Sequence, residues 1–256
     1  TLADGHTVIR PAAQEREVDD LIDFLRKMGA EIERTYPDTI EIHGKRRLRG
    51  AEHHVIPDRI EAGTFAVAGA VTGGQVTLTG APCDHMTAFL EVLGRTGVEA
   101  ACEGDRITID GRRVPEGALR AIDVETAPYP GLPTDVQPPT CVLLTQARGA
   151  STVHEAIFED RLEWLTELNR MGARIDITDK HHATIHGPTP LRGAEAEIGD
   201  LRAGASLILA ALAAKGESTI HGAHHVQRGY ENIERKFADL GARIARLEEG
   251  TVSTSS

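Results

Sequence analysis

Apolar positions recur every three or four residues in four segments of the chain, and each segment closes with a glycine. In the first segment these positions are Val18, Leu21, Ile22, Leu25 and Met28. The spacing predicts amphipathic helices with one buried face. Glycine adopts the left-handed conformation that ends a helix at little cost, so helix ends are expected at Gly29, Gly97, Gly172 and Gly241.

A short alternating stretch follows each of these glycines and predicts a strand. One-sided alternation is clear at Ile40 and Ile42 in the first copy, and at Ile107 and Ile109 in the second. The unit recurs after roughly 70 residues, which is longer than a solenoid repeat and closer to a small supersecondary domain. We therefore expect a fold built by internal duplication.

Three other helical segments are small and apolar nearly all round, and they begin near Phe65, Cys141 and Ser206. Helices of this composition are buried on every side. Sheets must then cover them. The sequence therefore predicts an α/β fold of repeated strand-helix units, with helices inside and sheets outside.

An aspartate stands ahead of each buried helix, at Asp58, Asp135 and Asp200. Aspartate is a favoured N-cap because it accepts hydrogen bonds from first-turn amides, so capping explains the residue type at all three places. The alternative is that a helix start binds an anionic ligand, which would compete with the cap for the same amides.

The run 126–137, TAPYPGLPTDVQ, sets Asp135 apart from the other two aspartates. Its prolines, Pro128, Pro130 and Pro133, fix φ and favour an extended, rigid approach to the carboxylate. Asp135 is therefore either a helix cap or a base.

Arginines form the second group of candidates. Arg161 and Arg228 are expected just inside the amphipathic helices of the third and fourth copies, and Arg202 in the first turn of the last buried helix. A cation at a helix start is unfavourable with the helix dipole, which indicates an anion or acidic partner nearby. A salt bridge without catalytic meaning is the alternative for each.

Composition excludes some classes of function. The net charge of −11 argues against a nucleic-acid or anionic-membrane surface, and no run is long enough to span a bilayer. The three cysteines, Cys83, Cys102 and Cys141, are far apart and odd in number, which favours a reducing cytoplasm over a disulfide framework. Three pairs of adjacent histidines lack companions at ligand spacing, so no metal site is expected.

Five segments together resemble one family in order along the chain: PDRIEAGTF, TAPYPGLPTDVQ, FEDRLEWLTELNRMGA, GDLRAGASLILA and RGYENIERKFADLGA. They look like the UDP-N-acetylglucosamine 1-carboxyvinyltransferases, which are enolpyruvyl transferases. The resemblance implies inside-out βαβαββ units in two lobes. Residues 1–56 would end the mid-chain lobe, and residues 57–256 would form most of the other. The missing N-terminal lobe and the start at Thr1 suggest a fragment or a processed product.

The resemblance also implies a reaction and its residues. The family transfers the enolpyruvyl group of phosphoenolpyruvate to the 3-hydroxyl of UDP-N-acetylglucosamine without a cofactor. Asp135 matches the general base, and Arg228 matches an arginine on the phosphoenolpyruvate side. The remaining substrate-binding positions would be Glu15, Asp58, Arg59, Ile157, Phe158, Arg161, Asp200, Leu201 and Arg202.

Several positions depart from the family pattern. Asp160 stands where the family usually has Asn, which adds negative charge beside Arg161, and Pro138 and Pro139 replace Ala and Gln. The Lys-Asn pair and the reactive-cysteine loop are missing, and Cys141 is expected in the core. Two alternatives stay open. One is a non-catalytic nucleotide-sugar binding module, and the other is transfer to a different acceptor, for which shikimate 3-phosphate fits the proline run poorly.

Overall fold

The computed structural model describes residues 1–114 and 117–247. Its first unit contains a three-stranded antiparallel sheet in the order β1-β3-β2, formed by β1 (His6–Ile9), β2 (Glu31–Tyr36) and β3 (Thr39–His43), with the helix α1 (Arg16–Lys27). A small core joins Ala12, Ile22 and Ile40. Leu21 is 53% exposed, so the apolar face of α1 is only partly covered.

The second unit comes after a segment, residues 44–58, without helix or strand. It begins with the buried helix α2 (Arg59–Val71) and contains the sheet β4-β6-β5, in which β4 (Gln75–Thr79) and β5 (Ala100–Glu103) flank β6 (Arg106–Asp110). The 3-10 helix η1 (Cys83–His85) leads into the helix α3 (Thr87–Thr96), and a second 3-10 helix, η2, spans Gly111–Arg113.

The third unit carries the proline run and the third sheet. Strands β7 (Val124–Glu125), β8 (Gly149–His154), β9 (Arg174–Ile177) and β10 (His182–Gly187) pair in the order β7-β8-β10-β9. The 3-10 helix η3 (Thr134–Val136) runs into the buried helix α4 (Gln137–Thr145), and α5 (Leu165–Arg170) is the outer helix.

The fourth unit is the least complete within the described residues. Its strands β11 (Glu195–Glu197) and β12 (Thr219–His221) pair in parallel on either side of the buried helix α6 (Leu201–Ala213) in the sequence. The 3-10 helix η4 (Ala223–Arg228) and the helix α7 (Ile233–Asp239) complete the unit.

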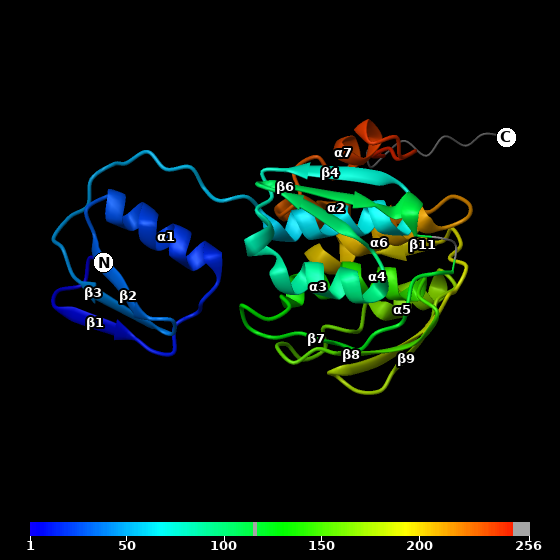
Figure 1. The fold of residues 1–256 in the computed structure, drawn as a ribbon, viewed down its shortest axis with the longest axis horizontal. Helices are drawn as coiled ribbons and strands as arrows, with labels where there is room; N and C mark the ends of the chain where they lie inside the picture. Colours follow the sequence, from blue (N-terminus) through cyan, green and yellow to red (C-terminus); the bar gives the residue numbers. More distant parts are fainter. Residues whose placement is uncertain (115–116, 248–256) are drawn as a thin grey trace.

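The predicted inside-out arrangement is confirmed. Helices α2, α4 and α6 contact one another in the interior, and Figure 1 shows β4 and β6 on one side of them and β7, β8 and β9 on the other. Their central residues are buried, including Phe65, Cys141 and Leu209. One apolar core runs through the second, third and fourth units, from Ile60 to Phe237. The predicted domain boundary after residue 56 stays a prediction.

The glycine turns are as expected, with one exception in the segment after the fourth glycine. Gly29, Gly97, Gly172 and Gly241 all have φ between 96° and 98°. Strands β2, β5 and β9 come after the first three, but residues 242–247 form no strand, contrary to our expectation. Each of the first three strands pairs with the strand after it, and within the described residues no such partner comes after the fourth glycine.

The prediction for the cysteines was partly wrong. Cys83 and Cys102 form a disulfide between η1 and β5, with Cα atoms 6.2 Å apart. The chain reverses direction through α3 and so brings together two cysteines that are 19 positions apart. Their spacing in the sequence did not reveal this pairing. Cys141 is free and buried as expected, and burial raises the pKa of its thiol. No described helix has the length and apolarity needed to cross a membrane.

Candidate active site

The three buried helices begin close together, and this brings distant parts of the sequence to one place. A Cβ atom on Gly63 in α2 would lie 3.0 Å from Val136, which precedes α4. Arg202 in the first turn of α6 reaches Asp135, and Tyr230 after η4 shares a 2.8 Å hydrogen bond with Thr64 of α2. Side chains from three repeats therefore meet at this end of the helices.

Two of the three aspartates cap their helices as predicted. Asp58 accepts hydrogen bonds from the amides of Ile60 and Glu61 at 2.8 and 3.0 Å. Asp200 accepts from Arg202 and Ala203, both at 2.9 Å. In each case the donors are the second and third helical residues, which are the usual partners of an N-cap side chain.

Asp135 does not cap its helix, which excludes one of the two alternatives for this residue. The residue lies in η3, and α4 has no side-chain cap. The second and third residues of α4 are Pro138 and Pro139. An N-cap carboxylate accepts from the amides two and three residues further on, but after Asp135 the amide of Gln137 donates to the carbonyl of Thr134, and Pro138 has no amide hydrogen. The carboxylate of Asp135 is therefore available for other partners.

Those partners are two arginines from different repeats. Arg161 Nη2 lies 2.6 Å from Asp135 Oδ1, and Arg202 Nε lies 3.2 Å from Oδ2. The carboxylate is 35% exposed, whereas the arginine side chains are 18% and 13% exposed. An ionised carboxylate has about four acceptor positions, so each oxygen can still accept one more hydrogen bond from the open side.

Arg202 is held by an aromatic ring as well as by the carboxylate. Its guanidinium lies over the ring of Tyr230, 5.3 Å from the centroid, which is a favourable cation–π geometry. Burial raises the pKa of Tyr230, although the hydrogen bond with Thr64 and the nearby Arg202 lower it. Arg202 Nη1 is buried and has no hydrogen-bond partner within residues 1–114 and 117–247. No pattern in the sequence indicated Tyr230 as part of the site.

The turn after β8 presents the next group of predicted residues. Ile157 is half-buried, and Phe158 is 52% exposed, with the guanidinium of Arg161 5.3 Å from its ring centroid. Arg161 lies in a turn ahead of α5 rather than inside the helix, so the predicted helical placement was wrong. The helix starts only at Leu165, because the preceding residues fold as turns around Asp160, which has φ 59°.

Asp160 itself points to another cation. Lys180 Nζ lies 3.1 Å from its carboxylate and 3.3 Å from that of Glu159. Asparagine and aspartate tolerate a positive φ better than other residues with a side chain, so Asp160 suits this backbone. Lys180 offsets the added negative charge beside Arg161.

Arg228 lies two residues before Tyr230, whose ring contacts Arg202. It is exposed and ends the 3-10 helix η4, ahead of α7 rather than within it, so its predicted helical placement was also wrong. The chain turns here so that Gly229 packs against Leu201, where an added Cβ would come within 3.0 Å of the leucine. Arg228 is thus anchored beside the start of α6.

Arg59 belongs to a neighbouring cluster on the other side of the proline run. It is buried, forms bonds of 2.8 and 3.3 Å to Glu17 of α1, and lies 5.6 Å from the ring centroid of Tyr129. Arg16 donates to the Tyr129 hydroxyl at 3.0 Å. Glu15 precedes α1, and its Oε2 is buried without a hydrogen-bond partner in the described part of the chain.

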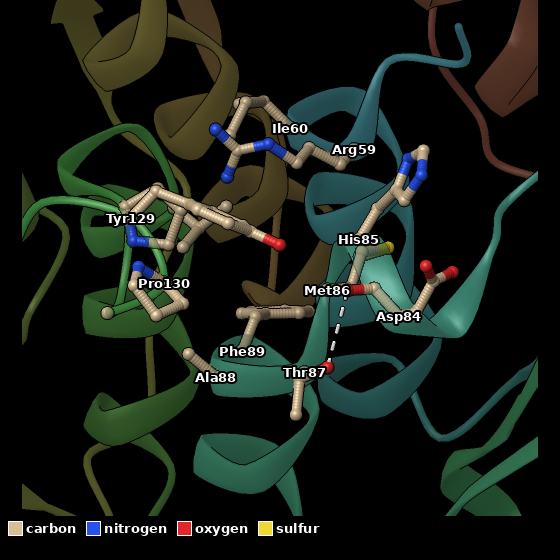
Figure 2. A pocket seen from close by; sticks show the side chains of 13 residues that line it. Arg59, Ile60, Asp84, His85, Met86, Thr87, Ala88, Phe89, Tyr129 and Pro130 are labelled. Atoms are coloured by element: carbon tan, nitrogen blue, oxygen red, sulfur yellow. Dashed lines mark hydrogen bonds between the residues drawn. The ribbon is translucent and has the colours of Figure 1, made fainter. Parts of the chain in front are cut away.

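A cavity of about 200 Å³ lies beside this cluster (Figure 2). Arg59, Met86, Phe89 and Tyr129 line it, and the Tyr129 hydroxyl points toward its centre. Asp135 and its two arginines do not line this cavity, although Val136 does. The charge of Arg59 is already met by Glu17. We therefore place the candidate chemistry at Asp135 and not in the cavity.

Sequence reasoning missed Glu155. The residue is fully buried, and its carboxylate accepts hydrogen bonds from the hydroxyls of Thr126 and Thr134 at 2.9 and 2.7 Å. The amides of Ile157 and Phe158 also donate to it, at 3.0 and 3.2 Å. A glutamate two residues from an apolar turn has no distinctive local pattern. Within the described residues, no group of three or more metal-ligating side chains is present.

Comparison with known proteins places this arrangement in a family. The family model described as EPSP synthase (3-phosphoshikimate 1-carboxyvinyltransferase) matches residues 1–237. The chain belongs to the EPSP synthase family. This is a carboxyvinyltransferase family, as the resemblance implied.

Relatives within the EPSP synthase family give a finer picture. The chain is 48% identical over 249 residues to the UDP-N-acetylglucosamine 1-carboxyvinyltransferase of Koribacter versatilis, covering 97% of this chain and 56% of the relative. It is 45% identical over 252 residues to the corresponding protein of Paramagnetospirillum magneticum, covering 98% and 57%. The chain therefore spans little more than half the length of these relatives.

Solved structures of the EPSP synthase family agree with the fold. The enolpyruvyl transferase NikO from Streptomyces tendae superposes with a TM-score of 0.85 at 31% identity, covering 95% of this chain and 57% of that one. EPSP synthase from Acinetobacter baumannii gives a TM-score of 0.72 at 23% identity, covering 96% and 59%. The enolpyruvyl transferase fold predicted from the sequence is confirmed.

Proposed function

We propose that this chain provides the acceptor-activating half of an enolpyruvyl transferase acting on UDP-N-acetylglucosamine and phosphoenolpyruvate. The observation that carries the proposal is the carboxylate of Asp135, which is free of capping duty and is oriented by Arg161 and Arg202. A general base needs a fixed orientation and an open acceptor position within hydrogen-bond reach of the substrate. The similarity to relatives named for this reaction supports the choice of substrates.

The reaction assigns each group a task. Asp135 removes the proton of the sugar 3-hydroxyl as its oxygen attacks C2 of phosphoenolpyruvate, and the methylene carbon gains a proton. The tetrahedral ketal then loses phosphate and a proton from the methyl group, which restores the enol ether. The exposed Arg228 is assigned to the phosphoenolpyruvate carboxylate and phosphate, where cations stabilise developing charge.

The other positions hold the substrates in this proposal. Phe158, Ile157 and Arg161 form the nucleotide-sugar side, and Asp200, Leu201 and Arg202 form the turn that responds to closure around the ligand. Asp58, Arg59 and Glu15 lie toward α1 and would contact substrate across the site. No metal or organic cofactor is required. The cytoplasmic location also stays a prediction.

Phosphate release tests the proposal. The complete gene product is assayed with phosphoenolpyruvate, with and without UDP-N-acetylglucosamine, and release is expected only when both are present. Asp135→Asn keeps the volume but loses the base, so kcat should fall about 100-fold or more. Asp110→Asn is the matched control, because Asp110, the last residue of β6, is paired with Arg112 of η2 and the variant should retain normal turnover. Normal turnover in Asp135→Asn would refute the assignment of the base.

Calorimetric titration separates the proposal from a purely binding role. The chain alone is titrated with UDP-N-acetylglucosamine. Micromolar binding by the chain, combined with no phosphate release by the complete gene product, would replace the transferase by a nucleotide-sugar binding module. Release with shikimate 3-phosphate in place of the nucleotide sugar would change the acceptor and leave the reaction class intact.

A further inference from the structure

Glu155 connects three segments that the proposed reaction uses. Its carboxylate is buried and bonded to Thr126 at the start of the proline run and to Thr134 at its end. The same carboxylate accepts the amides of Ile157 and Phe158 in the turn after β8. One side chain therefore fixes both ends of the run that carries the base, together with the turn opposite.

These contacts close a ring around the base. Thr134 is the residue before Asp135, Asp135 pairs with Arg161, and Arg161 lies over the ring of Phe158. The amide of Phe158 donates to Glu155, which completes the ring of contacts. A shift of the Thr134 hydroxyl would move Asp135 relative to Arg161, since only the intervening peptide separates the two residues.

The chemistry of the four donors suits an anchor. Two are hydroxyls and two are backbone amides, so all four hydrogen bonds to this buried carboxyl group come from donors without formal charge. A carboxyl group in an apolar core is costly unless it is hydrogen-bonded, and these four bonds satisfy it while they hold the run and the turn in place.

We propose that Glu155 is a positioning residue for Asp135, acting through the Thr134 hydroxyl. The inference rests on the proposed function, in which Asp135 is the base. Displacement of a catalytic group by about 1 Å can lower the rate about 100-fold. Loss of the Thr134 bond should therefore reduce turnover more than substrate binding.

Three threonine variants of the complete gene product test this. Thr134→Val removes the hydroxyl at constant volume, and kcat for phosphate release should fall at least about 10-fold while KM for UDP-N-acetylglucosamine changes less than about threefold. Thr134→Ser keeps the donor and should stay within about twofold of the parent protein. The matched control is Thr140→Val, because Thr140 is a nearby buried threonine of α4 whose hydroxyl donates to the carbonyl of Val136 and not to Glu155.

Crystal structures of the variants supply a readout that does not depend on activity. In Thr134→Val the contact between Asp135 Oδ1 and Arg161 Nη2 should lengthen beyond hydrogen-bond range, whereas in Thr140→Val it should stay near 2.6 Å. If Thr134→Val does not fold, Glu155→Gln takes its place under the same criteria, because glutamine leaves one of the four donors without an acceptor.

The outcomes separate this inference from the proposed function. If the parent protein releases no phosphate, the proposed function fails, and the crystallographic contact alone decides the positioning role. If the parent protein is active and Thr134→Val matches Thr140→Val in kcat and in the contact distance, the positioning role is refuted. A rise in KM with unchanged kcat would also refute it.

Discussion

Replacing aspartate by asparagine at two helix starts should have unequal effects on stability. Asparagine caps a helix as well as aspartate does, so Asp200→Asn should retain both amide bonds and lose only its interaction with the helix dipole, about 0.5 kcal/mol. Asp135→Asn removes a charge that two arginines share. The two substitutions are chemically identical, so any difference arises from the partners.

The structure gives the size of that difference. Exposed ion pairs contribute about 0.2–1 kcal/mol and hydrogen bonds to buried charges about 1.5–3 kcal/mol. The carboxylate of Asp135 is 35% exposed and its two contacts measure 2.6 and 3.2 Å, which places each pair between these limits. Two pairs at about 1 kcal/mol each correspond to a fall in Tm of about 4–8 °C for a chain of this size, against about 1–2 °C for Asp200→Asn.

Thermal unfolding followed by circular dichroism at 222 nm measures both variants at pH 7 and low salt. The larger loss in Asp135→Asn should shrink in 1 M NaCl, because salt screens partly exposed pairs. In a protein that already carries Arg161→Gln, Asp135→Asn should lower Tm by less than it does in the parent protein. Equal losses at the two aspartates, or a gain in stability for Asp135→Asn, would show that the two arginines do not hold this carboxylate.

Three further predictions concern the surrounding fold. Gly204→Ala should lower stability by about 1–3 kcal/mol in a urea titration, because the added Cβ would lie 2.6 Å from Ile198, and an unchanged midpoint would contradict the close packing. Reduction of the bond between Cys83 and Cys102 should lower stability by about 3 kcal/mol, and a Tm insensitive to reductant would argue that the bond is absent. Hydrogen bonds from the backbone amide of His181 and from the side chain of His182 lower the pKa of Asp179 below its ordinary value of 3.8. The contribution of Asp179 to stability is therefore present above pH 3.8 and is lost as the pH falls through the folded-state pKa. The Tm of Asp179→Asn should accordingly converge with that of the parent protein in acid.

Much of the fold could be predicted because its signals are local. Uniformly small, apolar segments identified α2, α4 and α6, and glycines after amphipathic runs identified the helix ends. These patterns depend only on helix geometry and on the conformational freedom of glycine. The disulfide and the anchor at Glu155 depend on contacts between segments far apart in the sequence, which no local pattern encodes.

The candidate site could be predicted only in part. The resemblance identified Asp135, Arg161 and Arg202, and the structure brings these three together, while Arg59 lies in a separate cluster. Arg228 is exposed at the end of η4. The sequence left two roles open for Asp135, a helix cap or a base, and the structure excludes the cap. Pro138 carried part of the missing signal, because the amide three residues after Asp135, from which a capping carboxylate would accept, has no hydrogen.

Repetition explains how the chain tolerates this exception. Of three equivalent helix starts, two are capped by their aspartates and one is not, and the missing cap lowers the free energy of unfolding by about 1 kcal/mol. That cost is small against the roughly 5–15 kcal/mol that typically separates a folded domain from its unfolded state. Internal duplication thus gives the molecule redundancy, and redundancy lets one aspartate of three specialise while the architecture stays intact.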